Sequence, residues 1–262
     1  MDDDARWDEA ARMLWQHGQQ GTRLDRLPAE LRPATRAEGY AIQACWERRS
    51  ALPLFGWKIA ATSEAGQRHI NVDGPLAGRL LAERVLPDGS TVSRAGSLMR
   101  VAEVELAFRL GTDLPPRSTP YRVDEVMAAV ATLHPAIEIP DSRYRDFCAV
   151  GAPQLIADNA CAHLFVLGPP VDVPWRHLDL AAHEVSAVVE GKSQHAGRGS
   201  NVLGDPRTAM TWIANELSGL GLGLAKGQVV TTGTCVVPVP VAPGDRFVAS
   251  YGAFGRLAVT FA

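Results

Sequence analysis

The segment at residues 100–108 reads RVAEVELAF, so it places two glutamates inside an otherwise apolar run. In a β-strand, residues two apart point to the same face, and Glu103 and Glu105 are therefore expected to project together. Two carboxylates side by side in a buried strand lose hydration and repel each other, and one hard cation would relieve both costs. Ligands that are all oxygen favour Mg²⁺ or Mn²⁺ over zinc. The alternative interpretation is an exposed edge strand with two solvated glutamates.

A second apolar stretch at residues 134–141 reads HPAIEIPD and carries Glu138 between two isoleucines. Glu138 is either a third metal ligand or a surface-facing residue of a half-buried strand. The sequence alone does not bring the two strands together. His134 is the histidine nearest to Glu138, and we expect it to have a packing role.

A lysine lies within a third apolar segment, GWKI at residues 56–59. Buried lysines are rare unless they are paired with an acid. Near a carboxylate-bound metal, Lys58 could pair with a substrate carboxylate or donate a proton. It could equally lie at a strand end with its ammonium group in solvent.

The rest of the chain, taken with these three apolar segments, predicts an α+β fold, because the expected strands and helices do not alternate regularly. Residue Asp205 followed by Pro206 predicts the N-terminus of a helix. We expect that helix at 205–217 and another at 123–133. Short apolar runs separated by Gly, Pro and Asp predict strands at 55–61, 100–110, 136–139, 162–167, 185–189, 228–232, 246–251 and 257–261.

The first 50 residues are predicted to be a helical N-terminal region, with residues 51–262 forming a catalytic domain. Apolar residues recur at helical spacing from about residue 4, and a loop with Pro28 and Pro33 follows. Thr35 is a plausible N-cap for a second helix, with Glu38 as its capping-box partner.

Composition narrows the class of protein. The 262 residues carry a formal net charge of -3, which gives no reason to expect nucleic acid or an anionic membrane as a partner. The four cysteines form no CxxC motif, so a disulfide framework or thiolate zinc site is not expected. An acidic N-terminus and the lack of an apolar run of about 20 residues predict a cytoplasmic protein.

Two glycine-containing segments could offer backbone N–H groups to a carboxylate, GRGSN at 197–201 and TTGT at 231–234. Each could equally be a plain turn. The first lacks the third glycine and the βαβ context of a dinucleotide fingerprint. No GxSxG, Walker A or HExxH motif is present.

Across roughly residues 50–262, the chain resembles the 2-keto-4-pentenoate hydratase and 4-oxalocrotonate decarboxylase family of the fumarylacetoacetate hydrolase superfamily. The matching segments occur in the family's order, although none of them specifies one substrate. They are GWKI at 56–59, VDGP at 72–75, EVE at 103–105, PAIE at 135–138, DNA at 158–160, GRGS at 197–200 with LG at 203–204, TG at 232–233 and PGD at 243–245.

The resemblance implies a mixed β-roll of the fumarylacetoacetate hydrolase C-terminal-domain type, with flanking helices. It also implies that Glu103, Glu105 and Glu138 bind Mg²⁺ or Mn²⁺, that Lys58 is the active-site lysine and that Asp73 is an acid or base near the substrate. Ser200, Thr234 and Leu76 fall in segments of the substrate pocket. Proteins similar to this one are usually homo-oligomers.

The activity implied by the resemblance is hydration of a 2-hydroxy-2,4-dienoate, through its 2-oxo-enoate form, to a 4-hydroxy-2-oxo acid, as in meta-cleavage catabolism of aromatic compounds. A decarboxylase of an oxalocrotonate-type diacid and an acylpyruvate-type hydrolase are the alternatives within enzymes. A non-catalytic protein that binds small acids is the alternative of another class. The chain departs from similar hydratases at PLAG, residues 75–78, where a polar or aromatic residue is common, and this leaves the substrate open.

Overall fold

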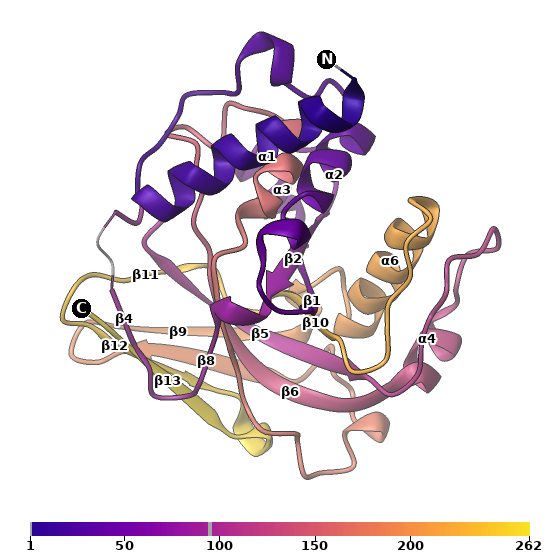
Figure 1. Ribbon diagram of the computed structural model, residues 1–262. Coiled ribbons are helices and arrows are strands. Elements are labelled where there is room, and N and C mark those ends of the chain that lie inside the picture. Colours follow the sequence, from indigo (N-terminus) through magenta and orange to yellow (C-terminus); the bar gives the residue numbers. More distant parts are fainter. Residues whose placement is uncertain (1, 94–95) are drawn as a thin grey trace.

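Two β-sheets form the centre of the structure, a computed structural model that describes residues 2–93 and 96–262 (Figure 1). Met1, the first residue of the predicted N-terminal region, and residues 94–95 of the predicted catalytic domain lie outside this description. The larger sheet has eight strands. Seven of them follow the order β2-β1-β10-β5-β6-β7-β3, and β11 pairs with β5 beyond the end of β10.

The larger sheet is mixed. Strand β1 runs parallel to β10 and β3 runs parallel to β7, whereas the other pairs are antiparallel. Strands β2 and β3 lie at opposite ends of the order, yet only the short helix η3 (Ala82–Arg84) separates them in the chain. The sheet is therefore curled. Its strands are β1 (Leu54–Ala60), β2 (Leu76–Leu81), β3 (Val85–Leu86), β5 (Val101–Leu110), β6 (Val130–Ile139), β7 (Leu164–Leu167), β10 (Val229–Thr234) and β11 (Val239–Pro240).

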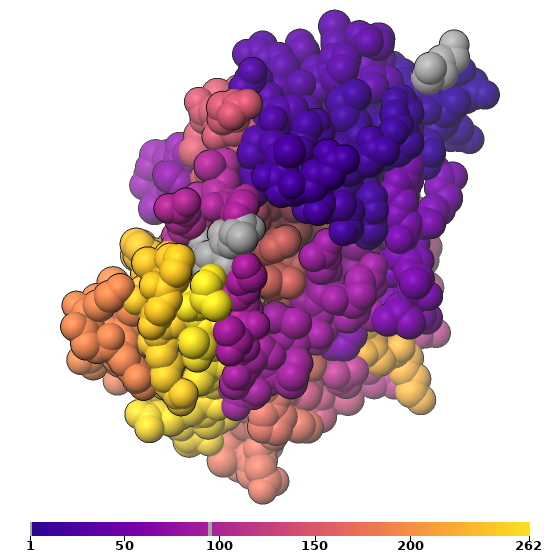
Figure 2. Space-filling view, turned by 60° about the vertical axis from the view of Figure 1, so that its left-hand side comes forward, coloured from indigo at the N-terminus to yellow at the C-terminus, as the bar shows by residue number. Residues whose placement is uncertain are grey.

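The second sheet has five strands in the order β4-β13-β12-β8-β9. Figure 2 shows that the yellow C-terminal strands of this sheet lie away from the indigo N-terminal helices. The strands are β4 (Thr91–Val92), β8 (Glu184–Val189), β9 (Ser193–Arg198), β12 (Arg246–Ser250) and β13 (Arg256–Phe261).

Helices α1, α2 and α3 gather at one end of the larger sheet, and α4 and α6 lie at its side (Figure 1). Helix α1 begins after Asp2, whose side chain accepts a hydrogen bond from the backbone N–H of Ala5 at 2.8 Å. In α2, Thr35 is the N-cap and Glu38 bonds the backbone N–H of Ala34. The helices are α1 (Asp3–Gln20), α2 (Arg36–Ala44), α3 (Glu64–His69), α4 (Val123–Ala129), α5 (Ala152–Ala157) and α6 (Pro206–Gly219).

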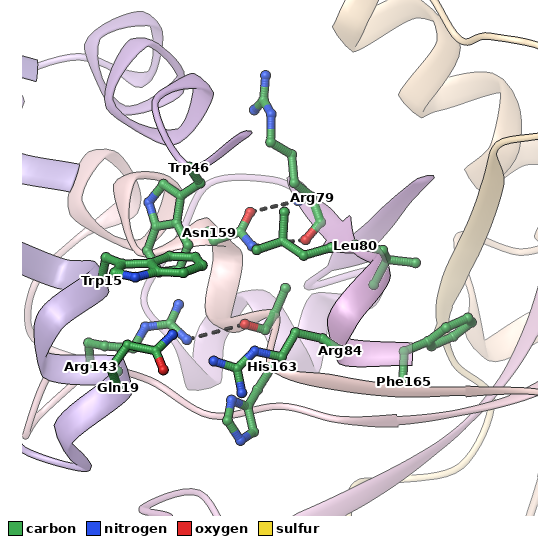
Figure 3. A pocket seen from close by; sticks show the side chains of 13 residues that line it. Trp15, Gln19, Trp46, Arg79, Leu80, Arg84, Arg143, Asn159, His163 and Phe165 are labelled. Atoms are coloured by element: carbon green, nitrogen blue, oxygen red, sulfur yellow. Dashed lines mark hydrogen bonds between the residues drawn. The ribbon is translucent and has the colours of Figure 1, made fainter. Parts of the chain in front are cut away.

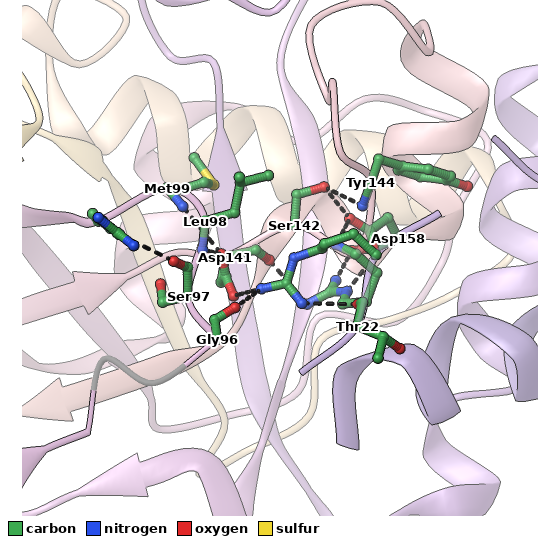
Figure 4. A network of polar contacts seen from close by, with 12 residues as sticks. Thr22, Gly96, Ser97, Leu98, Met99, Asp141, Ser142, Tyr144 and Asp158 are labelled. Carbon is green, nitrogen blue, oxygen red and sulfur yellow. Dashed lines mark hydrogen bonds and ion pairs between the residues drawn. The ribbon is translucent and has the colours of Figure 1, made fainter. Parts of the chain in front are cut away.

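A polar network joins the N-terminal residues to the ends of β5 and β6 (Figure 4). Asp141 follows β6, and its carboxylate accepts hydrogen bonds from the backbone N–H groups of Leu98 and Met99, just before β5. Arg23 reaches across from the N-terminal region and forms an ion pair with Asp141 at 2.5 Å. These contacts fix the two strand ends relative to each other. The division of the chain into two units at residue 50 remains a prediction.

The α+β class is confirmed, and the curled mixed sheet with flanking helices agrees with the β-roll that the resemblance implies. The helix expected at 123–133 is wrong beyond residue 129. Residues 130–133 begin β6, because pairing with β5 outweighs a helical pattern that apolar residues satisfy equally well. Strand β2 was not predicted, although it is fully buried beside β1. No helix among the described residues has the length and apolar character needed to cross a membrane.

Candidate metal and substrate site

Pairing between β5 and β6 brings the three predicted glutamates to one place. Glu103 lies directly opposite Glu138, and Glu105 lies opposite Ala136, so all three side chains share one face of the sheet. One carboxylate oxygen from each glutamate lies within 4.8 Å of the others. The two predicted acidic segments therefore meet, which their separation in sequence could not establish.

The carboxylates are poorly satisfied by the protein itself. Glu105 and Glu138 are fully buried, and Glu103 is partly exposed. Within the part of the chain that the structure describes, Glu105 Oε1 and both oxygens of Glu138 accept no hydrogen bond, whereas Glu105 Oε2 accepts bonds from the Thr231 hydroxyl and from the backbone N–H of Gly233, the latter at 3.0 Å. Buried carboxylate oxygens without donors are costly. A hard divalent cation would satisfy them, so this donor set fits Mg²⁺ or Mn²⁺.

Burial raises the pKa values of all three glutamates. Loss of hydration, with repulsion from Glu105, raises the pKa of Glu103 to about 7. Burial and the charge of Glu138 raise the pKa of Glu105 to about 7, against the hydrogen bonds from Thr231 and Gly233. Burial raises the pKa of Glu138 to about 8, although Lys58 opposes the shift. Burial thus favours the protonated forms of the three carboxyl groups, and a bound cation would favour the ionised forms.

Lys58 projects from β1 toward the same cluster. Its ammonium Nζ lies 3.1 Å from Glu138 Oε2 and donates a hydrogen bond to the carbonyl of Ala160 at 3.0 Å. Burial alone would lower the lysine pKa, but the three carboxylates outweigh it and raise the pKa above its usual value. Gly78 lies opposite Lys58 on β2, where a Cβ atom would come within 3.1 Å of the lysine side chain. The lysine is therefore charged, buried and closely confined.

An unusual turn at residues 158–162 supports Lys58 from the other side. Asn159, Ala160 and Cys161 have φ values of 56°, 49° and 61°, so three successive residues are left-handed without a glycine among them. Such residues cost about 1–2 kcal/mol each. The Asn159 side chain offsets part of this cost by bonding both the N–H and the carbonyl of Arg79 in β2, at 2.6 and 2.9 Å. The segment Asp158-Asn159-Ala160, one of those that carry the family resemblance, is thus a structural support for Lys58. The sequence did not reveal this role.

The predicted substrate-pocket residues lie around the end of β10 and the start of β2. Leu76 is fully buried opposite Ala60, two residues from Lys58 along β1. The Thr234 hydroxyl bonds the carbonyl of Val236, and the backbone N–H of Ser200 bonds Ala181. The segment that carries Ser200 lies against the end of β10, because the Asn201 side chain donates to the carbonyl of Cys235 at 2.7 Å.

Asp73 stands apart from the cluster. It lies in the connection between β1 and β2, with 83% of its side chain exposed, and forms an ion pair with Arg36 at 3.1 Å. Arg36 also donates to the carbonyl of Pro75 at 2.5 Å and approaches Glu216 of α6 at 3.4 Å. In this conformation Asp73 faces α2 and solvent, so its predicted acid–base role would require the connection to move.

His134 has the packing role that its sequence context predicts. Its Nδ1 lies 2.9 Å from the carbonyl of Gly168, and its Nε2 lies 2.8 Å from the Thr132 hydroxyl. Both ring nitrogens are therefore engaged away from Glu138. A water-activating pair of His134 and Glu138 is not formed.

Comparisons with known proteins bear on this site. The family model described as fumarylacetoacetate hydrolase C-terminal matches residues 68–262. A 2-keto-4-pentenoate hydratase of Paraburkholderia xenovorans is 32% identical over 257 residues, covering 97% of this chain and 94% of that protein. A 2-hydroxyhexa-2,4-dienoate hydratase of Comamonas testosteroni is 35% identical over 210 residues, covering 79% and 78%.

Among solved structures, the 4-oxalocrotonate decarboxylase from Pseudomonas putida G7, complexed with magnesium and adipate, superposes with a TM-score of 0.88. Its sequence is 25% identical, and the match covers 98% of both chains. The likeness therefore extends over the N-terminal helices as well as the sheets.

Proposed function

The chain belongs to the fumarylacetoacetate hydrolase family, and we propose that it is a divalent-metal-dependent hydratase of a 2-hydroxy-2,4-dienoate. Water would add to the 2-oxo-enoate form and give a 4-hydroxy-2-oxo acid, as in meta-cleavage catabolism of aromatic compounds. The observation that carries this proposal is the set of three convergent glutamates beside a buried lysine. The names of the relatives, which are hydratases of such dienoates, support the choice of reaction.

Glu103, Glu105 and Glu138 are the residues that would hold Mg²⁺ or Mn²⁺. Such a cation polarises a carbonyl oxygen and provides a positive centre for a 2-oxo carboxylate. Thr231 and Gly233 orient Glu105 by bonding one of its oxygens, which leaves the other oxygen free for the ion. These two residues act through Glu105 and are positioning residues in this proposal.

Lys58 would act on the substrate directly. Its Nζ has three donors, of which one is used by the carbonyl of Ala160 and another faces Glu138. The remaining donor could bond a substrate oxygen or move a proton. Leu76 would contact the carbon chain of the substrate, and Ser200 and Thr234 would line its carboxylate end. Asp73 would serve as acid or base after the connection between β1 and β2 has moved.

A decarboxylase of an oxalocrotonate-type diacid is the second candidate. The extensive superposition on the 4-oxalocrotonate decarboxylase favours it. An acylpyruvate-type hydrolase is less supported, because both nitrogens of His134 are engaged away from Glu138. Pure binding of small acids is disfavoured by the cost of keeping two buried carboxylates, a third that is partly exposed and a buried lysine together without using them. A cytoplasmic homo-oligomer remains our expectation.

Product analysis separates these candidates. The metal-loaded protein is expected to convert a 2-hydroxy-2,4-dienoate to the 4-hydroxy-2-oxo acid, and a chelator should abolish this conversion until Mg²⁺ or Mn²⁺ is restored. Carbon dioxide release from an oxalocrotonate-type diacid, without hydration of the dienoate, would favour the decarboxylase. Cleavage of an acylpyruvate would favour the hydrolase. Tight binding of oxalate without turnover of any of the three would support the binding protein.

A further inference from the structure

A small cavity lies between the N-terminal helices and the rim of the larger sheet (Figure 3). The indole rings of Trp15 and Trp46 form one side, and Leu80 and Phe165 of the sheet form the opposite side. Its volume is about 30 Å³. By the usual measure this is room for one or two water molecules, and hence for one halide ion or one carboxylate group.

Basic groups gather in this cavity. Arg84 follows β2, Arg143 follows β6 and His163 precedes β7, and all three line the cavity with their side chains in the same region (Figure 3). Arg79 also contributes to the lining, but its guanidinium points away, toward Glu47 and Gln43 of the N-terminal region. The basic character therefore comes from Arg84, Arg143 and His163.

The acidic residues near the cavity have other hydrogen-bond or ion-pair partners. Asp158 forms a fully buried ion pair with Arg143 and also accepts a hydrogen bond from Ser142 at 2.7 Å. Asp141 is paired with Arg23. Glu83, the neighbour of Arg84 in sequence, accepts a hydrogen bond from the hydroxyl of Ser50 at 2.8 Å. Among the described residues, no carboxylate bonds Arg84 directly, and the charge of Glu83 offsets only part of its own.

Arg84 is consequently a positive charge without a directly bonded partner. Within residues 2–93 and 96–262, no hydrogen bond or ion pair of its guanidinium is formed, although the residue is only partly exposed. Burial and the neighbouring charge of Arg143 lower its pKa. Burial, followed by the charge of Arg143, lowers the pKa of His163 to about 4, so this imidazole is neutral and has one N–H to donate.

We propose that this cavity binds one small monovalent anion, a halide ion or the carboxylate group of a small free acid, between Arg84 and His163. An anion there would accept hydrogen bonds from the unpaired guanidinium and the imidazole N–H and would neutralise the surplus charge. The site is separate from the proposed metal cluster. The two share one structural element, because Asn159 and Ala162 line the cavity while Ala160, between them, holds Lys58.

The test uses thermal unfolding of the full chain in sodium bromide and in sodium sulfate of equal ionic strength, without divalent metal. An anion that binds only the folded state stabilises it progressively as its concentration rises. We expect the Tm in bromide minus the Tm in sulfate to be larger for the natural chain than for Arg84→Gln. Arg84→Lys should retain part of the bromide effect, because it keeps the charge. Arg256→Gln, at an exposed arginine of β13, is the matched control and should respond as the natural chain does.

Diffraction from crystals of the natural chain grown with bromide provides the second measurement. An anomalous peak within the cavity, absent in Arg84→Gln, is expected. Identical Tm responses of the natural chain and Arg84→Gln, together with a cavity without bromide, would overturn the proposal. Sedimentation velocity, which reports the oligomeric state, tests whether the negative charge comes instead from a second copy of the chain. If Arg84→Gln changes the oligomeric state and leaves the bromide response intact, the occupant is a carboxylate of a second copy, and the free-anion proposal is wrong.

Discussion

Replacing Glu138 with glutamine is expected to lower the affinity of the protein for Mn²⁺ by at least about 100-fold, because loss of a residue that merely orients a metal ligand already costs 10- to 100-fold. Glutamine keeps the volume of the side chain but removes the charge. Among the described residues, neither oxygen of Glu138 accepts a hydrogen bond and Oε2 has only the ion pair with Lys58, so a metal ion is their expected further partner. Turnover of the dienoate should be lost together with metal binding.

Isothermal titration with Mn²⁺, followed by a turnover assay, measures both effects of Glu138→Gln. The matched control is Glu184→Gln, because Glu184 is an exposed glutamate at the start of β8. The control should bind Mn²⁺ as the natural chain does. A folded Glu138→Gln variant with undiminished Mn²⁺ affinity would show that Glu138 is not a ligand.

Replacing Lys58 with methionine is expected to give a different outcome. We expect kcat to fall by about 10²- to 10⁴-fold, the usual contribution of a positioned acid–base group. Mn²⁺ affinity should be unchanged or higher, because the ammonium group 3.1 Å from Glu138 repels a cation in the same cluster. Methionine is of similar length and is unbranched, so it can occupy the confined space beside Gly78.

The Lys58→Met variant is measured by steady-state kinetics and by Mn²⁺ titration of the same preparation. Lys226→Met is the matched control, since the side chain of Lys226 is exposed in the turn before β10. The split between kcat and metal affinity is what identifies the role. If kcat is normal, the lysine only balances charge. If Mn²⁺ binding and thermal stability are both lost, its role is structural.

Local sequence patterns predicted a large part of this molecule. Alternation along residues 100–108 placed Glu103 and Glu105 on one face of a strand, and β5 has that form. Asp205 is the N-cap of α6, because its side chain accepts from the backbone N–H of Arg207 at 2.7 Å. Such features depend on neighbours a few residues away, which a sequence displays directly.

The remaining features depend on long-range pairing. The register that sets Glu103 opposite Glu138 is a property of the assembled sheet, so the sequence could nominate the acids without placing them together. The start of β6 at Val130 was missed for the same reason. The left-handed turn at Asn159 is stabilised by bonds from its side chain to β2, which lies far away in sequence. The unpaired charge of Arg84 becomes visible only when the partners of the surrounding acids are known.

Anomalous diffraction from crystals grown with Mn²⁺ and oxalate tests the central claim most directly. The account predicts one manganese peak in direct contact with carboxylate oxygens of Glu103, Glu105 and Glu138, with the oxalate oxygens completing its coordination on the Lys58 side. Manganese located only elsewhere, with the three carboxylates turned away from one another, would contradict it.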